Sequence, residues 1–183
     1  MFEKVLIANR GEIAVRIVRA CAEAGIKSVA IYTDADRYAL HVKKADESYS
    51  LGPDSVSGYL NIHRIVNLAV ATGCNALHPG YGFLSENAEF ARACEKRGIR
   101  FIGPSADVIH RLGDKVEARD AMIQAGVPVT PGSDGNVASV DEALQWAEKI
   151  GYPVMLKATA GGGGRGIRRC GDADELKRNY DRV

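Results

Sequence analysis

Short apolar runs alternate with amphipathic segments along the first hundred residues. Residues 5–8 (Val-Leu-Ile-Ala) and 29–32 (Val-Ala-Ile-Tyr) are continuous apolar runs, as expected for strands that a sheet buries on both faces. Between them, residues 12–24 place apolar side chains three and four positions apart, which is the spacing of one helix face. The pattern therefore predicts a strand, a helix and a second strand in succession.

The same alternation continues to residue 103. It predicts helices over 62–71 and 87–96 and strands over 76–78 and 100–102. Strands that alternate with helices of this length indicate a parallel sheet with helices on both faces and right-handed crossovers. We therefore expect an α/β, Rossmann-like domain over residues 1–103.

The rhythm changes after residue 103. Residues 108–112 and 116–125 predict two successive helices, and the two prolines of 128–132 resist helix formation. We interpret residues 104–132 as a helical connector. The remaining residues, 133–183, predict a third segment whose elements are a helix over 140–150, a strand over 153–158, a return strand over 166–170 and a helix from Asp172 to the end.

Composition and charge narrow the classes of function. The chain has 183 residues, of which 46% are hydrophobic and 26% charged, which is typical of a globular protein with a packed core. Its 24 Lys and Arg against 23 Asp and Glu give a net charge of +1, so no global charge favours nucleic acid or a membrane surface. No signal peptide or membrane helix is expected, and the four cysteines lack disulfide or metal spacing, so we expect a cytoplasmic protein.

The stretch 160–166 (Ala-Gly-Gly-Gly-Gly-Arg-Gly) carries the strongest functional signal. Backbone amides without side chains can wrap a phosphate closely, and the alternative interpretation is that the stretch forms a flexible hairpin tip. A dinucleotide fingerprint requires a helix after the glycines, and a Walker A loop requires Gly-Lys-Ser/Thr, whereas Ile167 follows Gly166 and starts a strand. A strand, a glycine loop and a strand predict a lid over a nucleotide.

Three cations accompany this stretch. Lys157 lies in an apolar strand, where a buried ammonium group needs water or an anion; a phosphate would supply a charged hydrogen bond of ~1.5–3 kcal/mol. Lys115 follows Gly113 and Asp114 at a predicted helix start, and Arg165 lies within the glycines. From the residues alone, each could equally be a solvated surface cation, with Lys157 extending from an edge strand.

Several segments together resemble the biotin carboxylases. They are residues 7–14 (IANRGEIA), 78–87 (HPGYGFLSEN), 101–104 (FIGP), 113–115 (GDK), and Lys157 with the glycines of 161–166. The resemblance covers essentially the whole chain. It implies that the Rossmann-like sheet is a pre-ATP-grasp domain, followed by the incomplete start of an ATP-grasp domain whose truncated lid subdomain spans 133–183.

The resemblance also implies an activity. It is the ATP-dependent carboxylation of biotin, carried on a biotin carboxyl carrier, with bicarbonate as carbon source and carboxyphosphate as intermediate, within a pyruvate or acetyl-CoA carboxylase. ATP and Mg²⁺ would be the cofactors. The residues implied to bind ATP are Lys115, Lys157, Gly161, Gly162, Gly163, Gly164, Arg165 and Gly166.

The resemblance places the magnesium, bicarbonate and biotin residues beyond Val183, so we assign no catalytic or metal residue and expect residues 1–183 alone to be inactive. The implied partners are the carrier, a carboxyltransferase subunit and a second copy bound through Arg19 and Glu23 of the first helix. We expect neither nucleic acid nor membrane as a partner. His78 is interpreted as shaping the turn over 79–82, with no chemical role.

Three alternatives remain open. The first is a nicotinamide-dependent dehydrogenase, which the single glycine of the first strand-to-helix turn, Gly11, disfavours. The second is a non-catalytic module that binds another subunit. The third is a different bicarbonate-using ATP-grasp ligase, against which the 78–87 segment argues.

Overall fold

The computed structural model describes residues 2–53, 56–158 and 166–183. They group into two compact units, Met1–His110 and Arg111–Val183.

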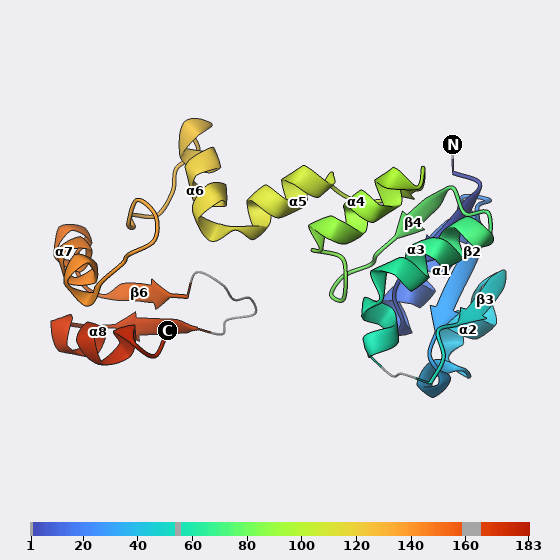
Figure 1. The fold of residues 1–183 in the computed structure, drawn as a ribbon, viewed down its shortest axis with the longest axis horizontal. Helices are drawn as coiled ribbons and strands as arrows, with labels where there is room; N and C mark the ends of the chain where they lie inside the picture. The colour runs from blue at the N-terminus through green and yellow to red at the C-terminus, as the bar shows by residue number, and fades with distance from the viewer. Residues whose placement is uncertain (1, 54–55, 159–165) are drawn as a thin grey trace. The chain divides into compact units, whose positions relative to one another are not determined.

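The first unit is an α/β domain around one parallel sheet (Figure 1). Its elements in chain order are β1 (Lys4–Ile7), α1 (Gly11–Glu23), β2 (Lys27–Tyr32), η1 (Asp34–Asp36), α2 (Leu40–Lys44), β3 (Glu47–Ser50), η2 (Ser57–Leu60), α3 (Ile62–Ala71), β4 (Ala76–His78), α4 (Ala88–Lys96) and β5 (Arg100–Phe101), with α5 (Ala106–Gly113) crossing into the second unit.

The five strands lie in the order β3-β2-β1-β4-β5, and all neighbours are parallel. The chain therefore runs outward from β1 in one direction through β2 and β3, and in the other through β4 and β5. In the register, Leu6 of β1 lies between Val29 of β2 and Leu77 of β4. The predicted α/β, Rossmann-like fold is confirmed.

Helices cover the two faces of this sheet unequally. On one face, α3 and α4 pack side by side against Leu6, Val29 and Leu77 in the larger cluster of buried side chains (Figure 1). On the other face, α1 packs against Val5 and Ile7 in a smaller cluster. Because successive side chains of a strand point to opposite faces, Leu6 belongs to the first cluster, whereas Val5 and Ile7 belong to the second.

Two elements of the first unit were absent from our sequence predictions, α2 and β3. The sequence of β3, Glu-Ser-Tyr-Ser, has no apolar run because β3 is an edge strand whose side chains are exposed or half-buried. The prediction that the last helix extends to the end of the chain was wrong, since α8 ends at Tyr180.

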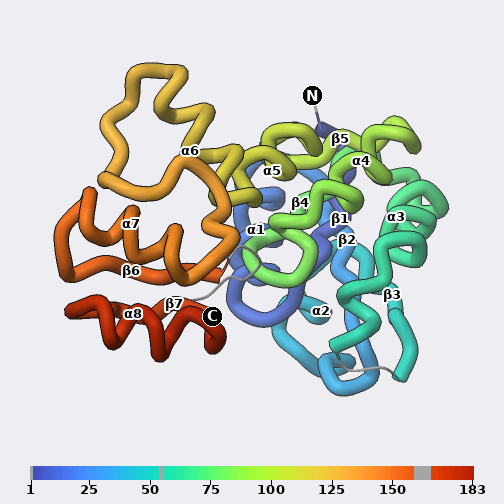
Figure 2. The backbone as a smooth tube through the Cα atoms, turned by 60° about the vertical axis from the view of Figure 1, so that its left-hand side comes forward, coloured from blue at the N-terminus to red at the C-terminus, as the bar shows by residue number. Residues whose placement is uncertain are grey.

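The second unit contains a two-stranded antiparallel hairpin with two helices on one of its faces. Its elements are α6 (Lys115–Gln124), α7 (Val140–Ile150), β6 (Val154–Lys157), β7 (Ile167–Cys170) and α8 (Ala173–Tyr180). Ser139 and Asp172 cap α7 and α8 by accepting backbone N–H groups. Figure 2 shows α7 and α8 running alongside the strands, and their apolar side chains form one buried cluster with Val154, Leu156 and Cys170.

Within 2–53, 56–158 and 166–183, every helix is too short or too polar to cross a membrane. Over the same ranges, three or more His, Cys, Asp or Glu side chains nowhere gather as a metal site would require.

Candidate nucleotide site

The hairpin of β6 and β7 presents one covered face and one open face. Residues directly opposite each other in an antiparallel pair lie on the same face. The register pairs Val154 with Cys170, and these two side chains pack under α7 and α8. The alternate pairs, Met155 with Arg169 and Lys157 with Ile167, therefore share the opposite, open face.

Lys157 lies at the end of β6 on this open face. Its side chain is exposed, so the desolvation argument that singled it out from an apolar strand does not apply. The strand alternates half-buried and exposed residues, and Lys157 falls on the exposed positions. An accessible ammonium group at the end of a strand that leads into a glycine run is positioned to receive an anion.

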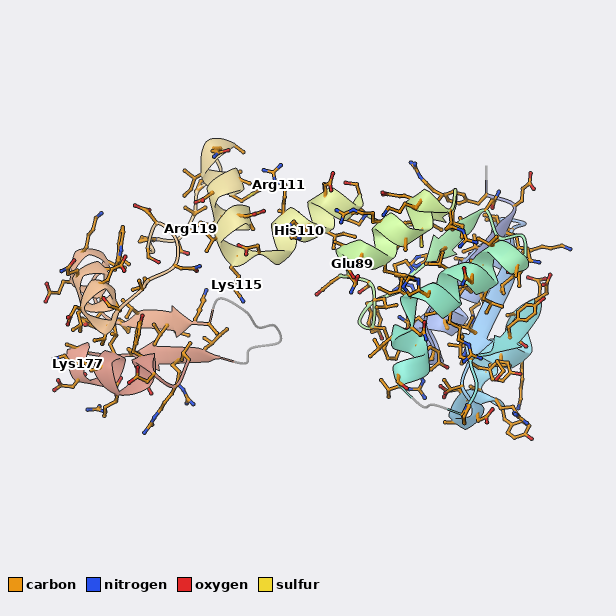
Figure 3. All side chains as sticks on the ribbon, in the orientation of Figure 1. Glu89, His110, Arg111, Lys115, Arg119 and Lys177 are labelled. Carbon is orange, nitrogen blue, oxygen red and sulfur yellow. The ribbon has the colours of Figure 1, made fainter. Side chains whose placement is uncertain are left out.

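Lys115 reaches the same end of β6 from another element. Asp114 caps α6 by accepting the N–H groups of Val116 and Glu117 at 2.8 and 3.0 Å, which makes Lys115 the first residue of the helix. The Nζ of Lys115 donates a hydrogen bond to the carbonyl oxygen of Ala158 at 3.4 Å, and Figure 3 shows the side chain extending from the start of α6 toward the end of β6. The structure therefore brings Lys115 to the residue that follows Lys157.

The glycine run is described only at its last residue. Gly161, Gly162, Gly163, Gly164 and Arg165 lie outside the described residues. Gly166 has a φ of +68°, and a Cβ at this position would lie 2.8 Å from the Cβ of Ala158. Its carbonyl accepts the N–H of Ala158 at 2.8 Å, so the pairing of the two strands continues one residue beyond Lys157 and Ile167.

Two residues of the open face were missed by the sequence reasoning. Met155 is 53% exposed and Ile167 is 38% exposed, and the register places them diagonally on either side of Lys157 and Arg169. Exposed apolar side chains beside cations can pack against a planar base while the cations bind a phosphate tail. The signal was available, because the period of two along 154–157 already separates Met155 and Lys157 from Val154 and Leu156.

In the first unit, the 78–87 segment is tied to the strand β1. The Nδ2 of Asn9 donates to the carbonyl oxygens of Pro79 and Tyr81, both at 2.8 Å. The N–H of Gly80 donates to Nδ1 of His78 at 3.0 Å, which supports the interpretation that His78 shapes this turn. Burial lowers the pKa of His78, and a ring whose Nδ1 accepts this bond carries its proton on Nε2.

A hydrogen-bond network around the buried carboxylate of Asp36 links the segments that follow β1 and β2. The Nε of Arg10 donates to Oδ2 of Asp36 at 2.6 Å, and the hydroxyl of Tyr59 donates to the same oxygen at 2.8 Å. The hydrogen bonds from Arg10 lower the pKa of Asp36. Burial, followed by the Asp36 hydrogen bond, raises the pKa of Tyr59 to about 12. This network holds the turn after β2 against the turn after β1.

Arg19 and Glu23, implied as dimer contacts, are both exposed on α1. They line a shallow hollow of about 500 Å³ together with Glu12, Val15, Arg16, Ala20 and Leu40. Leu40 is 52% exposed, so this face offers a surface of mixed charge with an apolar edge.

Two family profiles match the chain. Residues 1–109 match the family described as "Biotin carboxylase, N-terminal domain". Residues 114–182 match the family described as "Carbamoyl-phosphate synthase L chain, ATP binding domain". The residues of the open hairpin face therefore fall within the part that matches an ATP-binding domain.

Curated relatives match over nearly the whole chain. The 2-oxoglutarate carboxylase small subunit of Hydrogenobacter thermophilus is 58% identical over 99% of the chain, which covers 38% of that protein. Biotin carboxylase 1 of Bacillus subtilis is 57% identical over 96% of the chain, which covers 39% of that protein. The chain thus spans about two fifths of the length of these relatives.

Solved structures match equally well. The biotin carboxylase domain dimer of the Hydrogenobacter thermophilus 2-oxoglutarate carboxylase, in complex with MgADP, ADP and bicarbonate, is 57% identical with a TM-score of 0.94, covering 100% of this chain and 40% of that one. A biotin carboxylase complex with a β-γ-ATP ligand from Campylobacter jejuni is 46% identical with a TM-score of 0.95, covering 100% and 41%.

Proposed function

Because the chain belongs to the biotin carboxylase family, we propose that it forms the first, nucleotide-binding part of a biotin carboxylase, a ligase that uses ATP and bicarbonate to carboxylate biotin on a carrier protein or domain. The observation that carries the proposal is the hydrogen bond from Lys115 to Ala158, which brings one cation to the strand end where a second cation, Lys157, meets the glycine run. Two ammonium groups at the end of a strand that leads into a glycine run suit a triphosphate tail, because backbone amides without side chains can also approach phosphates closely.

The residues present fit ATP in two respects. Lys115 and Lys157 would bind the phosphates with the glycines of 161–166 and Arg165, while Met155 and Ile167 would pack against the base on the open face. Phosphoryl transfer depends on positioning and on neutralising charge around the transferred group. We assign this positioning and neutralising role to the two lysines.

The described residues hold no cluster of three acidic or other metal-binding side chains. We therefore propose that the Mg²⁺ ligands, and the groups that bind bicarbonate and biotin, belong to the three fifths of the relatives that this chain does not span. Magnesium would supply charge neutralisation between the phosphates, and in a biotin carboxylase the product of the first transfer is carboxyphosphate.

The remaining assignments are proposals of the same kind. Residues 104–132 would connect the sheet domain to a lid subdomain over 133–183. Arg19 and Glu23 would contribute to a homodimer through the exposed face of α1, because that face is hollowed and rimmed by both charges. A biotin carboxyl carrier and a carboxyltransferase subunit would be the protein partners, in the cytoplasm.

The test is binding of MgATP to the 183-residue chain, measured by calorimetry on wild type, Lys115→Ala, Lys157→Ala and the control Lys177→Ala. Lys177 is an exposed cation of α8. Loss of one charged hydrogen bond, ~1.5–3 kcal/mol, weakens affinity by roughly 10- to 150-fold in either test variant. Equal affinity in all four proteins would remove Lys115 and Lys157 from the site.

A second measurement concerns catalysis. We expect purified residues 1–183 to show no ATP turnover that depends on free biotin and bicarbonate, because the proposed metal and bicarbonate groups lie elsewhere. Turnover above the control without enzyme would contradict this placement of the catalytic groups.

A further inference from the structure

The helix α6 carries Lys115 but has no buried side chain to anchor it. None of its ten residues, all of them described, is buried, and none belongs to the apolar cluster under α7 and α8. Apolar packing therefore constrains the helix only weakly. The bond from Lys115 to the carbonyl oxygen of Ala158 nevertheless requires one particular placement of α6, so polar contacts along the helix must contribute to it.

The chain folds back beside α6 after the helix ends. The N–H of Val127 donates to the carbonyl oxygen of Met122 at 2.9 Å, and Gly126 has a φ of +72°, which together form a common left-handed helix stop. The returning segment meets the helix at Thr130, which lies eleven positions after its partner Arg119.

Arg119 makes this contact with its guanidinium group. Its Nη1 donates to the carbonyl oxygen of Thr130 at 2.7 Å, and a Cβ on Gly132 would lie 3.5 Å from its Cζ. Lys115 and Arg119, both labelled in Figure 3, are four positions apart on α6, so they share one helix face. That face is therefore tied at its start to the end of β6 and, one turn later, to the segment that leads to α7.

The acceptor of this bond is part of a stiff stretch of backbone. Pro128 and Pro131 lie on either side of Thr130. A proline ring fixes its own φ, and it also restricts the residue that precedes it, which here is Thr130. The Thr130 carbonyl is therefore a fixed point against which a helix can be held.

We propose that Arg119 is a positioning residue, which holds α6 against Thr130 and thereby keeps Lys115 at the end of β6. The inference rests on the proposed function, in which Lys115 binds a phosphate, and Arg119 itself does not contact the nucleotide. Its contribution to stability is small, because its Nε is buried without a hydrogen-bond partner among the described residues, which offsets the bond that Nη1 makes. Variants of Arg119 should therefore fold, which circular dichroism checks.

The first experiment measures MgATP binding to the 183-residue chain by calorimetry. We expect Arg119→Ala to weaken the affinity about fivefold, the loss that follows when a freed α6 keeps Lys115 in its binding placement for about one fifth of the time. Arg119→Lys should stay within about twofold of wild type, because an ammonium group can also donate to the Thr130 carbonyl. The control Arg178→Ala, at an exposed cation of α8, measures the effect of losing a positive charge alone.

The same substitution in two backgrounds separates positioning from a general effect. In Lys115→Ala, the further loss from Arg119→Ala should fall below about twofold, whereas in Lys157→Ala it should remain about fivefold. Equal losses in the two backgrounds would overturn the proposal. Wild-type affinity in Arg119→Ala, while Lys115→Ala binds weakly, would also overturn it.

A measurement without nucleotide distinguishes this inference from the proposed function. Residual dipolar couplings of the amide groups report the orientation of α6 relative to α7 and α8, and those of α6 alone should change in Arg119→Ala. Unchanged couplings of α6 would overturn the proposal. Changed couplings, together with equal MgATP affinity in wild type and Lys115→Ala, would support the positioning of Lys115 by Arg119 and contradict the proposed nucleotide site.

Discussion

Two glycines of the 78–87 segment form a matched pair for measuring what Asn9 contributes. Gly80 and Gly82 have nearly equal backbone angles, with φ of +68° and +64°. A Cβ on Gly82 would meet nothing within 4 Å, whereas a Cβ on Gly80 would lie 2.7 Å from Nδ2 of Asn9. Alanine at either position therefore carries the same backbone strain, but only Gly80→Ala displaces the Asn9 amide.

The magnitudes follow from these contacts. A residue with a Cβ in the left-handed region costs roughly 1–2 kcal/mol, which is the loss of stability expected for Gly82→Ala. Displacing Asn9 also breaks its bonds to the carbonyls of Pro79 and Tyr81, at about 0.5–1.5 kcal/mol each. Gly80→Ala should therefore cost about 2–5 kcal/mol in the free energy of unfolding of the first unit.

Amide hydrogen exchange of β1 and β4 measures this quantity for the first unit alone. In an Asn9→Ala background the extra cost of Gly80→Ala should disappear, because the bonds it breaks are already absent, and a double-mutant cycle isolates that term. If Gly80→Ala and Gly82→Ala reduce stability by amounts within about 0.5 kcal/mol of each other, Asn9 does not hold the 78–87 turn.

Two further predictions concern the buried polar residues near β2. Tyr59→Phe keeps the stacking on Phe83 but removes the hydroxyl that accepts the N–H of Thr33 and donates to Asp36. Urea unfolding followed by circular dichroism should therefore show a free energy of unfolding that is lower by about 2–4 kcal/mol. The control Tyr38→Phe, at an exposed residue, should change it by less than about 0.5 kcal/mol. Burial lowers the pKa of His41 from its ordinary 6.5, so the unfolded chain binds more protons than the folded one below that pH. The stability of the first unit should therefore fall as the pH drops below about 6.5, and His41→Gln should flatten this pH dependence. An unchanged slope in the variant would show that His41 does not titrate in this range.

Much of the first unit could be predicted because its strands are buried on both faces. The apolar runs 5–8 and 29–32 and the predicted strand 76–78 coincide with β1, β2 and β4 to within two residues. The edge strand β3 was missed because its side chains are exposed or half-buried, so its sequence carries no apolar run. The other edge strand, β5, was predicted because it contains the buried Phe101.

The sequence identified Lys157 as a candidate phosphate-binding residue, but for a reason that the structure does not support. Lys157 was chosen because an apolar strand seemed to bury it, whereas it is exposed on the open face of a two-stranded hairpin. Its placement beside Lys115 depends on the bond to Ala158, which joins residues 43 positions apart in sequence. No local pattern encodes such a contact, and only the resemblance to a family had brought the two lysines together.

The geometry of the first unit also argues against the dehydrogenase alternative on electrostatic grounds. In a doubly wound sheet, a dinucleotide places its pyrophosphate at the amino end of the helix that follows the first strand, where free N–H groups and the helix dipole favour negative charge. At that end of α1, the carboxylate of Glu12 already accepts the N–H of Ile13 at 2.7 Å and the hydroxyl of Tyr81. A pyrophosphate would have to displace the Glu12 carboxylate, which the helix end and the hydroxyl of Tyr81 both stabilise. Beside it, the side chain of Asn9 already links the segment after β1 to the carbonyls of Pro79 and Tyr81. Nucleotide binding in this chain is therefore expected in the second unit, where cations rather than a carboxylate stand at the end of the strand.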